Sequence, residues 1–343
     1  MKAVLIKGLG IPLSLETVPD PTPGPGEAVA RVHACGAGLT IHHARAGRTR
    51  VDYPRILGHE IAGEIVAVGS GVSEVHVGDA VTAYFYLTCG HCHWCRINRE
   101  TLCDNLAGHI GRDIDGGYAE YMKAPARSFI KLPPDLDWRN QPAEAAVICD
   151  AIATPVKVIR KARLSYNDTV AVFGAGGGLG LHMLQVARWA GAKKVIGVDV
   201  MASKFEACLK AGADYCVDAT AGQVVEQLRE LTQGKGVDVA IDFVGASECG
   251  AAALRAMNKG GRLVLLAGHG KGFNTEALLQ RGELEVMGSR YATRQEVIEA
   301  LELVARGALR AIVNEKVPLA QAEAVHQRLD RGLVTGRAAL MIA

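Results

Sequence analysis

Four cysteines lie within one short segment of the chain, with the spacing of a metal site. Cys89, Cys92 and Cys95 are separated by two residues each, and Cys103 follows after seven more. Two-residue gaps let successive thiolates surround one tetrahedral ion, and four thiolates leave no position open for a substrate. Disulfides would need an oxidising compartment, and we expect no signal peptide because the strand-like segment 2–6 opens the chain. The spacing therefore predicts a structural zinc site.

A glycine-rich turn carries the second chemical signal. Segment 173–180, Phe-Gly-Ala-Gly-Gly-Gly-Leu-Gly, follows a strand-like run and opens the helical stretch 181–190. Backbone N–H groups and a helix N-terminus at such a turn bind a pyrophosphate. Ala175 replaces the first glycine of the usual fingerprint, and Gly174 beside it relieves the turn. The predicted cofactor-binding positions of this loop are Gly174, Ala175, Gly177, Gly178, Leu179 and Gly180.

A carboxylate at the end of the next strand-like run indicates which dinucleotide binds. Asp199 lies nineteen residues after Gly180. A carboxylate at this place accepts hydrogen bonds from the ribose diol and repels a 2′-phosphate, so NAD is favoured over NADP. Lys204, expected one turn into the next helix, either flanks the adenosine ribose or is an ordinary solvated lysine.

The elements that must position these residues change in type near residue 150. Before it, short β-like runs are broken by Pro and Gly. The expected strands there are 29–33, 61–68 and 80–84. From about 155 to 287, strands alternate with amphipathic helices, which predicts an α/β fold with a parallel, doubly wound sheet. Its expected strands are 169–173, 194–198, 237–242 and 261–266. The tail then returns to the first domain.

Composition limits the choice of partners. The chain has 343 residues, 49% hydrophobic and 22% charged, which is enough for two cores. A formal net charge of +2 gives no electrostatic basis for nucleic acid or an anionic membrane surface as the main partner. No apolar run approaches the length of a membrane span. We expect a cytoplasmic homodimer or homotetramer that acts on a small molecule.

Several motifs spread along the chain belong together. They are the cysteine cluster, Gly58-His59-Glu60, Gly78-Asp79, the segment 116–121, the loop 174–180, the segment 242–245 and Gly336-Arg337. In combination they resemble the zinc-containing medium-chain dehydrogenases/reductases, the alcohol dehydrogenase family, over nearly the whole chain. The resemblance implies a GroES-like catalytic domain with a structural zinc lobe at 1–152, a Rossmann domain at 153–287, and a return to the catalytic domain at 288–343.

The resemblance assigns further roles at the cofactor, which it places in the cleft between the domains. Thr154 and Val244 would contact NAD, with Val244 at the nicotinamide. Arg337 would reach the pyrophosphate; without the resemblance it would be a surface arginine.

At the family's catalytic zinc the sequence departs from the pattern. Members carry Cys-Gly-x-Cys before Gly-His-Glu, and the second cysteine binds the ion. Here Gly38 stands at that position, and Cys35 matches the cysteine that does not bind metal. The remaining matched positions are His59, Glu60 and Asp150. This set either holds zinc as a harder, weaker site or is empty. Cys149 is an alternative third ligand, and a hydrogen-bonded turn is the structural alternative for the His-Glu pair.

The family's proton-relay positions are present. Thr40 lies where a hydroxyl faces the substrate oxygen, and His43 lies where a histidine passes the proton to solvent. The neighbouring His42 is expected to be solvated. Phe85 and Tyr86 match the edge of the substrate pocket, or they are plain strand aromatics. Arginines 45, 48, 50 and 55 form either a solvated face or a landing site for an anionic substrate handle.

Two hydride-transfer chemistries fit these residues. In the first, zinc polarises the oxygen of an alcohol or carbonyl, as in an NAD-dependent alcohol dehydrogenase. In the second, no catalytic metal binds, and Thr40 with backbone donors holds the carbonyl of an α,β-unsaturated substrate, as in zinc-free reductases of the superfamily. The relay pair and Asp150 favour the first. A dinucleotide sensor without catalysis is a third hypothesis, against which the intact relay argues.

Overall fold

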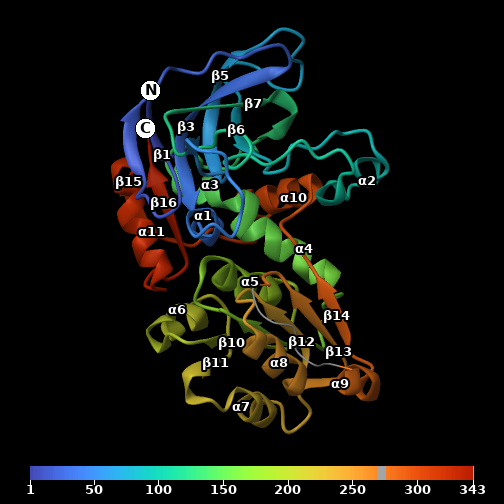
Figure 1. The fold of residues 1–343 in the computed structure, drawn as a ribbon. Coiled ribbons are helices and arrows are strands. Elements are labelled where there is room, and N and C mark those ends of the chain that lie inside the picture. The colour runs from blue at the N-terminus through green and yellow to red at the C-terminus, as the bar shows by residue number, and fades with distance from the viewer. Residues whose placement is uncertain (269–275, 343) are drawn as a thin grey trace. The chain divides into compact units, whose positions relative to one another are not determined.

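The computed structural model describes residues 1–268 and 276–342, and the chain divides into two compact units. Unit 1 combines Met1–Ala153 with Ala292–Ala343, and unit 2 is Thr154–Tyr291. In Figure 1, unit 1 holds the blue start and the red end of the chain, while the yellow and orange strands belong to unit 2. Among the described residues there is no helix with the length and apolar character of a membrane span.

Unit 1 is built on a seven-stranded sheet and a small three-stranded sheet. The large sheet contains β3 (Glu27–Ala37), β5 (Ile61–Val68), β6 (Ala80–Ala83), β7 (Tyr121–Pro125), β8 (Phe129–Lys131), β15 (Val313–Pro318) and β16 (Arg337–Met341). Its order is β15-β16-β3-β5-β6-β8, and β7 also pairs with β3. The small sheet has the order β2-β1-β4, from Ser14–Thr17, Lys2–Ile6 and Arg55–Ile56. The last strand thus pairs with a strand from the start of the chain.

Short helices complete unit 1. They are α1 (Leu39–Arg45), α2 (His93–Arg96), α3 (Pro142–Val147), α10 (Arg294–Ala305) and α11 (Ala322–Asp330), with a π-helical turn, η3 (Ile148–Ile152), and 3-10 turns at Glu100–Leu102, Ala126–Ser128 and Leu319–Gln321. Helix α10 begins with a capping box, in which Thr293 and Glu296 each bond the other's backbone N–H.

Unit 2 is a doubly wound sheet of six parallel strands, as predicted. The strands are β9 (Thr169–Phe173), β10 (Lys194–Asp199), β11 (Tyr215–Asp218), β12 (Val237–Asp242), β13 (Met257–Leu265) and β14 (Glu285–Gly288). Their order is β11-β10-β9-β12-β13-β14, and Figure 1 shows the later strands side by side. The chain turns in opposite directions on the two sides of β9, which makes the carboxyl end of β9 the topological switch point where α/β sheets bind ligands.

Helices connect these strands. They are α4 (Ala153–Lys161), α5 (Gly178–Trp189), α6 (Phe205–Lys210), α7 (Val224–Leu231), α8 (Ser247–Ala256) and α9 (Glu276–Gly282), with 3-10 turns at Ala202–Lys204 and Ala219–Ala221. Helix α5 packs on β9 and β10, and α8 packs on β12 and β13. Val170, Ala171 and Val172 of β9 are fully buried, as expected for a strand covered on both faces.

Three expected strands, 61–68, 169–173 and 237–242, have the predicted bounds. The run expected at 29–33 instead continues to Ala37 in β3. The extension, Ala-Cys-Gly-Ala, has no β-branched or aromatic residue to signal a strand. Pairing on both sides holds it extended, because Cys35 pairs with Ile61 of β5 and with Leu340 of β16.

Candidate active site and zinc lobe

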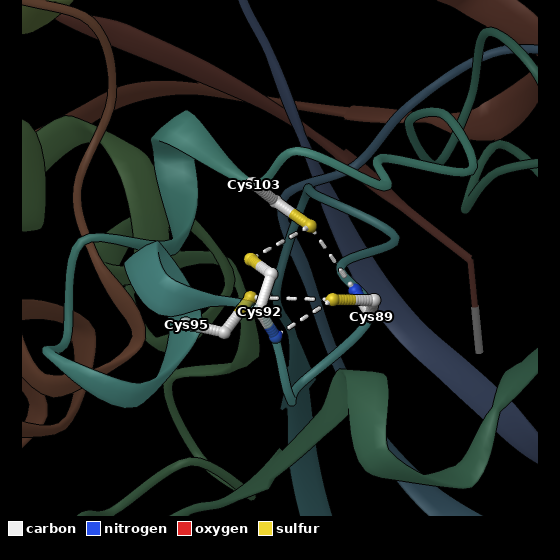
Figure 2. A group of neighbouring side chains, drawn as sticks. All are labelled: Cys89, Cys92, Cys95 and Cys103. Atoms are coloured by element: carbon white, nitrogen blue, oxygen red, sulfur yellow. Dashed lines mark hydrogen bonds between the residues drawn. The ribbon is translucent and has the colours of Figure 1, made fainter.

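The four cysteines of the zinc motif converge in the loop after β6. Figure 2 shows their sulfur atoms turned toward one another. The Sγ atoms of Cys89 and Cys95 are 3.9 Å apart, as are those of Cys92 and Cys103. All four sulfurs lie within 4.8 Å of one another. A tetrahedron with Zn–S bonds of about 2.3 Å has sulfurs about 3.8 Å apart, so the four thiolates would hold one zinc ion with no open position.

Backbone donors favour the thiolate form of Cys89, whereas burial raises the pKa of Cys95. The N–H of Cys92 donates to Sγ of Cys89, and the N–H of Cys89 donates to Sγ of Cys103, each at 3.3 Å. Hydrogen bonds from backbone N–H groups, that of His91 first, lower the pKa of Cys89 to about 5. A thiolate is the form that binds metal.

Replacing Cys95 with serine is expected to reduce zinc binding and the stability of the lobe, without a direct effect on hydride transfer. Because serine cannot supply a thiolate, zinc content should fall by about one ion per chain, with a drop in Tm on the order of 10 °C. Elemental analysis and thermal melts check this, with Cys249→Ser on α8 as the control cysteine outside the cluster. A Cys95→Ser protein with parental zinc content and Tm, but no activity, would contradict the structural role.

The predicted ligands His59, Glu60 and Asp150 meet in unit 1 and are buried. Nε2 of His59 is 3.6 Å from Oδ2 of Asp150 and 3.9 Å from Oε1 of Glu60. Asp150 projects from the π-helical turn η3, a geometry that often marks functional sites. The preceding Gly58 has a φ of +92°, and a Cβ there would come within 2.4 Å of the Tyr118 ring, so only glycine fits this turn.

The Arg337 guanidinium lies between the two carboxylates. Its Nε donates to Oε2 of Glu60 at 3.0 Å, and its Nη2 donates both to Oε1 of Glu60 and to Oδ2 of Asp150, the latter at 3.2 Å. The arginine is buried, which rules out the surface alternative. Burial raises the pKa of Glu60, and the charge of Arg337 opposes that rise. The predicted contact of Arg337 with a pyrophosphate remains a prediction.

Gly38 gives this guanidinium its space. A Cβ atom at position 38 would lie 2.9 to 3.0 Å from the Nη1, Cζ and Nη2 atoms of Arg337. That is closer than the optimal separation of non-bonded atoms. The register that pairs Ala338 of β16 with Ala37 of β3 sets the two residues side by side. A cysteine at position 38 would therefore crowd the guanidinium and require it to shift from this conformation.

The donor set does not fit zinc while Arg337 holds this position. A divalent ion would need the carboxylate oxygens that already accept hydrogen bonds from the guanidinium. The positive charges of the ion and of the guanidinium would also repel one another strongly at such short separations. Cys149 offers no substitute, since its Sγ donates to the Ala146 carbonyl at 3.4 Å and burial raises the pKa of this thiol. Asp150, and not Cys149, joins the cluster with His59 and Glu60.

The relay residues Thr40 and His43 lie one turn apart on α1, and both are half-buried. Positions i and i+3 share a helix face. The expectation that His42 is solvated is wrong, because its Nδ1 lies 2.5 Å from Oδ1 of Asp330 on α11. Arg45 adds a contact of 2.6 Å to Glu323 of the same helix. These ion pairs fix the helix that carries the relay.

The remaining arginines of this segment differ in their surroundings. Arg55 is 3.1 Å from Asp115, and Arg50 is 3.7 Å from Asp52. Arg48 and Arg50 are exposed. The hypothesis of a landing site for an anionic substrate thus loses Arg45 and Arg55, whose charges are already paired.

An aromatic wall lies against His59. The ring of Phe85 is 4.5 Å from that of His59 and 4.8 Å from that of His109, and Tyr86 is 5.1 Å from His109. The sequence did not predict the place of His109 beside these rings. Its Nδ1 is 3.0 Å from Oδ2 of Asp113, an i,i+4 pair that gave the only local signal. Phe85 and Tyr86 are buried, and their role at the substrate remains a prediction.

In unit 2 the glycine-rich turn has the geometry of a dinucleotide cradle. Gly174 has a φ of +77°, and a Cβ on Gly180 would lie 2.1 Å from the Gly174 carbonyl oxygen. Gly177 is the N-cap of α5, so the first N–H groups of that helix end the loop. Asp199 closes the loop from β10, since its Oδ2 accepts from the Gly176 N–H at 2.8 Å. These residues fit a bound pyrophosphate and ribose.

The neighbours of the cradle are also in place. The solvated alternative for Lys204 is wrong, because this lysine is 6% exposed and its Cδ would lie 2.5 Å from a Cβ on Gly176. Burial lowers the pKa of Lys204, and Asp199 opposes that shift. Val244 lies beside Gly174 and is 43% exposed, which leaves it open to a ligand. Thr154 is buried.

A parallel sheet with a dinucleotide turn, joined to a β-rich unit with a zinc lobe, defines a class of nicotinamide-dependent oxidoreductases. Residues 24–134 match the alcohol dehydrogenase GroES-like domain, and residues 178–306 match the zinc-binding dehydrogenase domain. An NAD-dependent alcohol dehydrogenase of Sulfurisphaera tokodaii is 32% identical, with 99% of this chain and 100% of the relative covered.

Solved structures agree with these matches. The crystal structure of AibC is 37% identical with a TM-score of 0.90, covering 100% of this chain and 96% of that one. The alcohol dehydrogenase from Aeropyrum pernix is 33% identical with a TM-score of 0.92, covering 99% and 100%. The chain belongs to the zinc-containing medium-chain dehydrogenase/reductase family, as predicted. It is an NAD-dependent oxidoreductase of the alcohol dehydrogenase type, which moves a hydride between nicotinamide and a substrate that is an alcohol or a carbonyl compound.

Proposed function

We propose that this enzyme uses NADH to reduce a carbonyl compound conjugated to a carbon–carbon double bond, without a metal ion at His59, Glu60 and Asp150. The observation that carries the proposal is the Arg337 guanidinium bound to both carboxylates. An isolated carbonyl concentrates the developing charge on an alkoxide oxygen, which the family stabilises with a metal. Conjugation instead gives an enolate, for which hydrogen-bond donors suffice.

The chain's own residues supply those donors. Hydride from NADH forms a bond to the β-carbon, and the π electrons of the double bond move to give the enolate. The Thr40 hydroxyl donates a hydrogen bond to the enolate oxygen. Uptake of a proton at the α-carbon then gives the saturated carbonyl compound and NAD⁺. In this proposal His43, one helical turn from Thr40 on α1, exchanges that proton with solvent.

Metal-dependent alcohol oxidation is the second candidate. It is supported by the convergence of His59, Glu60 and Asp150, whose ligand atoms lie within 4.8 Å of one another. Zinc there would act as the electrophile at the alcohol oxygen. It requires Arg337 to leave the carboxylates, and for that reason we rank it below the conjugate reduction.

Matched substrates separate the two candidates. After chelation that leaves about one zinc per chain in the lobe, we expect unchanged NADH oxidation with conjugated enones and enoyl thioesters. Their kcat/KM should exceed those of the matched saturated ketones and aldehydes by about 100-fold or more. Two zinc ions per chain, with alcohol oxidation that is lost on chelation, would establish the metal-dependent enzyme instead. Turnover with no member of either panel would support the sensor hypothesis.

We also propose a cytoplasmic location, because four neighbouring cysteines stay reduced, and so able to bind zinc, in a reducing compartment. The homodimer or homotetramer expected from the sequence stays a prediction, which light scattering on the purified protein would check.

A further inference from the structure

We infer that Arg337 is the resident cation of the Glu60 and Asp150 pair, and that Gly38 is its matched partner. Together these two residues prevent a divalent metal ion from binding at His59, Glu60 and Asp150, which would otherwise form a metal site. The inference deepens the proposed function and shares its dependence on Arg337. Its test measures metal binding and not turnover, so the inference and the proposed function can each fail while the other holds.

The first argument is the identity of the contacted atoms. Oε1 of Glu60 and Oδ2 of Asp150 are the oxygens that approach Nε2 of His59, at 3.9 and 3.6 Å. The same two oxygens accept from Nη2 of Arg337. An ion coordinated by all three side chains would therefore compete directly with that nitrogen for both oxygens.

The second argument is charge. Two carboxylates are buried here, and buried charges persist only when they are paired. One guanidinium gives hydrogen bonds to three of their four oxygens. A divalent ion would meet the same demand, so the arginine and the ion are alternative partners for one pair of carboxylates.

The third argument is the space at position 38. Because a Cβ there would lie within 3.0 Å of three guanidinium atoms, even alanine would force the guanidinium to shift from this position. The strand register keeps the backbone of Arg337 beside Gly38, so the contact is relieved by movement of the guanidinium and not of the strands. Gly36 leaves space in the same way for the Glu60 carboxylate, since a Cβ at position 36 would lie 2.3 Å from Oε2 of Glu60. Glycine in place of cysteine at position 38 therefore has two effects: it removes a metal ligand, and it leaves space for the Arg337 guanidinium.

Cobalt binding to the protein, with zinc already saturating the lobe, tests the inference. Calorimetry should detect no additional Co²⁺ on the parent protein. Arg337→Ala should bind about one Co²⁺ per chain, at least about 100-fold more tightly than the parent, because the guanidinium no longer occupies the carboxylate oxygens that face His59. Adding Asp150→Asn to Arg337→Ala should abolish this binding.

Two variants at position 38 keep the test sharp if Arg337→Ala does not fold. Gly38→Ala crowds the guanidinium without supplying a ligand, whereas Gly38→Cys crowds it and adds a thiolate. We expect a sulfur-to-cobalt charge-transfer band only in Gly38→Cys, with tighter binding than in Gly38→Ala. Parent protein that binds Co²⁺ as tightly as Arg337→Ala would overturn the inference, and so would a Gly38→Cys protein without the band.

Discussion

Thr40→Val lowers kcat/KM for the conjugated substrate by about 100- to 1000-fold if the threonine hydroxyl stabilises the enolate oxygen. Valine has nearly the shape of threonine, and Thr40 is only half-buried on α1, so the fold should tolerate the change. The loss should appear in kcat more than in KM, because the hydrogen bond strengthens as charge develops on the oxygen. Steady-state NADH oxidation measures both constants.

Two further variants show whether the hydroxyl itself is responsible. Thr40→Ser keeps the donor and should stay within about 10-fold of the parent. Thr49→Val alters another half-buried threonine, just beyond α1, and should leave kinetics unchanged. If Thr40→Val retains parental kcat and Tm, the oxygen is held by other groups and the proposed role of Thr40 is wrong.

The parts of this enzyme that could be predicted from sequence are those whose partners are close along the chain. The thiolates of Cys89, Cys92 and Cys95 lie on one loop and a short helix, so their spacing alone determines that the sulfurs meet. The turn after β9 is equally local, because the strand, the glycines and the start of α5 are contiguous. In such segments a few residues determine the geometry, and pattern is enough.

The surroundings of the carboxylates could not be predicted, because they depend on strand register between distant segments. Arg337 meets Glu60 and Gly38 only because β16 pairs with β3 and β3 pairs with β5. From sequence, Gly38 indicated only a missing ligand, and Arg337 belonged to the cofactor by resemblance. The pairing of His42 with Asp330 was hidden for the same reason, since it needs α1 and α11 to be neighbours.

Asp199→Ala is expected to narrow the preference for NAD over NADP by about 10- to 100-fold, through loss of charge repulsion with the 2′-phosphate. The structure shows why this carboxylate is well placed. Its Oδ2 accepts from the Gly176 N–H at 2.8 Å, and its Oδ1 accepts from the Met201 N–H at 3.0 Å. These two hydrogen bonds hold the negative charge of Asp199 beside the glycine-rich loop. A mobile side chain could turn away from the 2′-phosphate, but this carboxylate is held in place.

Alanine at this position also leaves two backbone donors without their acceptor, so a second variant must isolate the charge. Asp199→Asn keeps a side-chain oxygen for the Gly176 N–H while removing the charge, and should narrow the preference with a smaller loss of Tm than Asp199→Ala. Asp218→Asn is the matched control, because Asp218 pairs with Asp199 in register at the end of β11 but caps the turn at Thr220. Its cofactor ratio should equal that of the parent. Steady-state kinetics with both dinucleotides measure the ratios, and a parent enzyme that uses NAD and NADP with equal efficiency would remove the role assigned to Asp199.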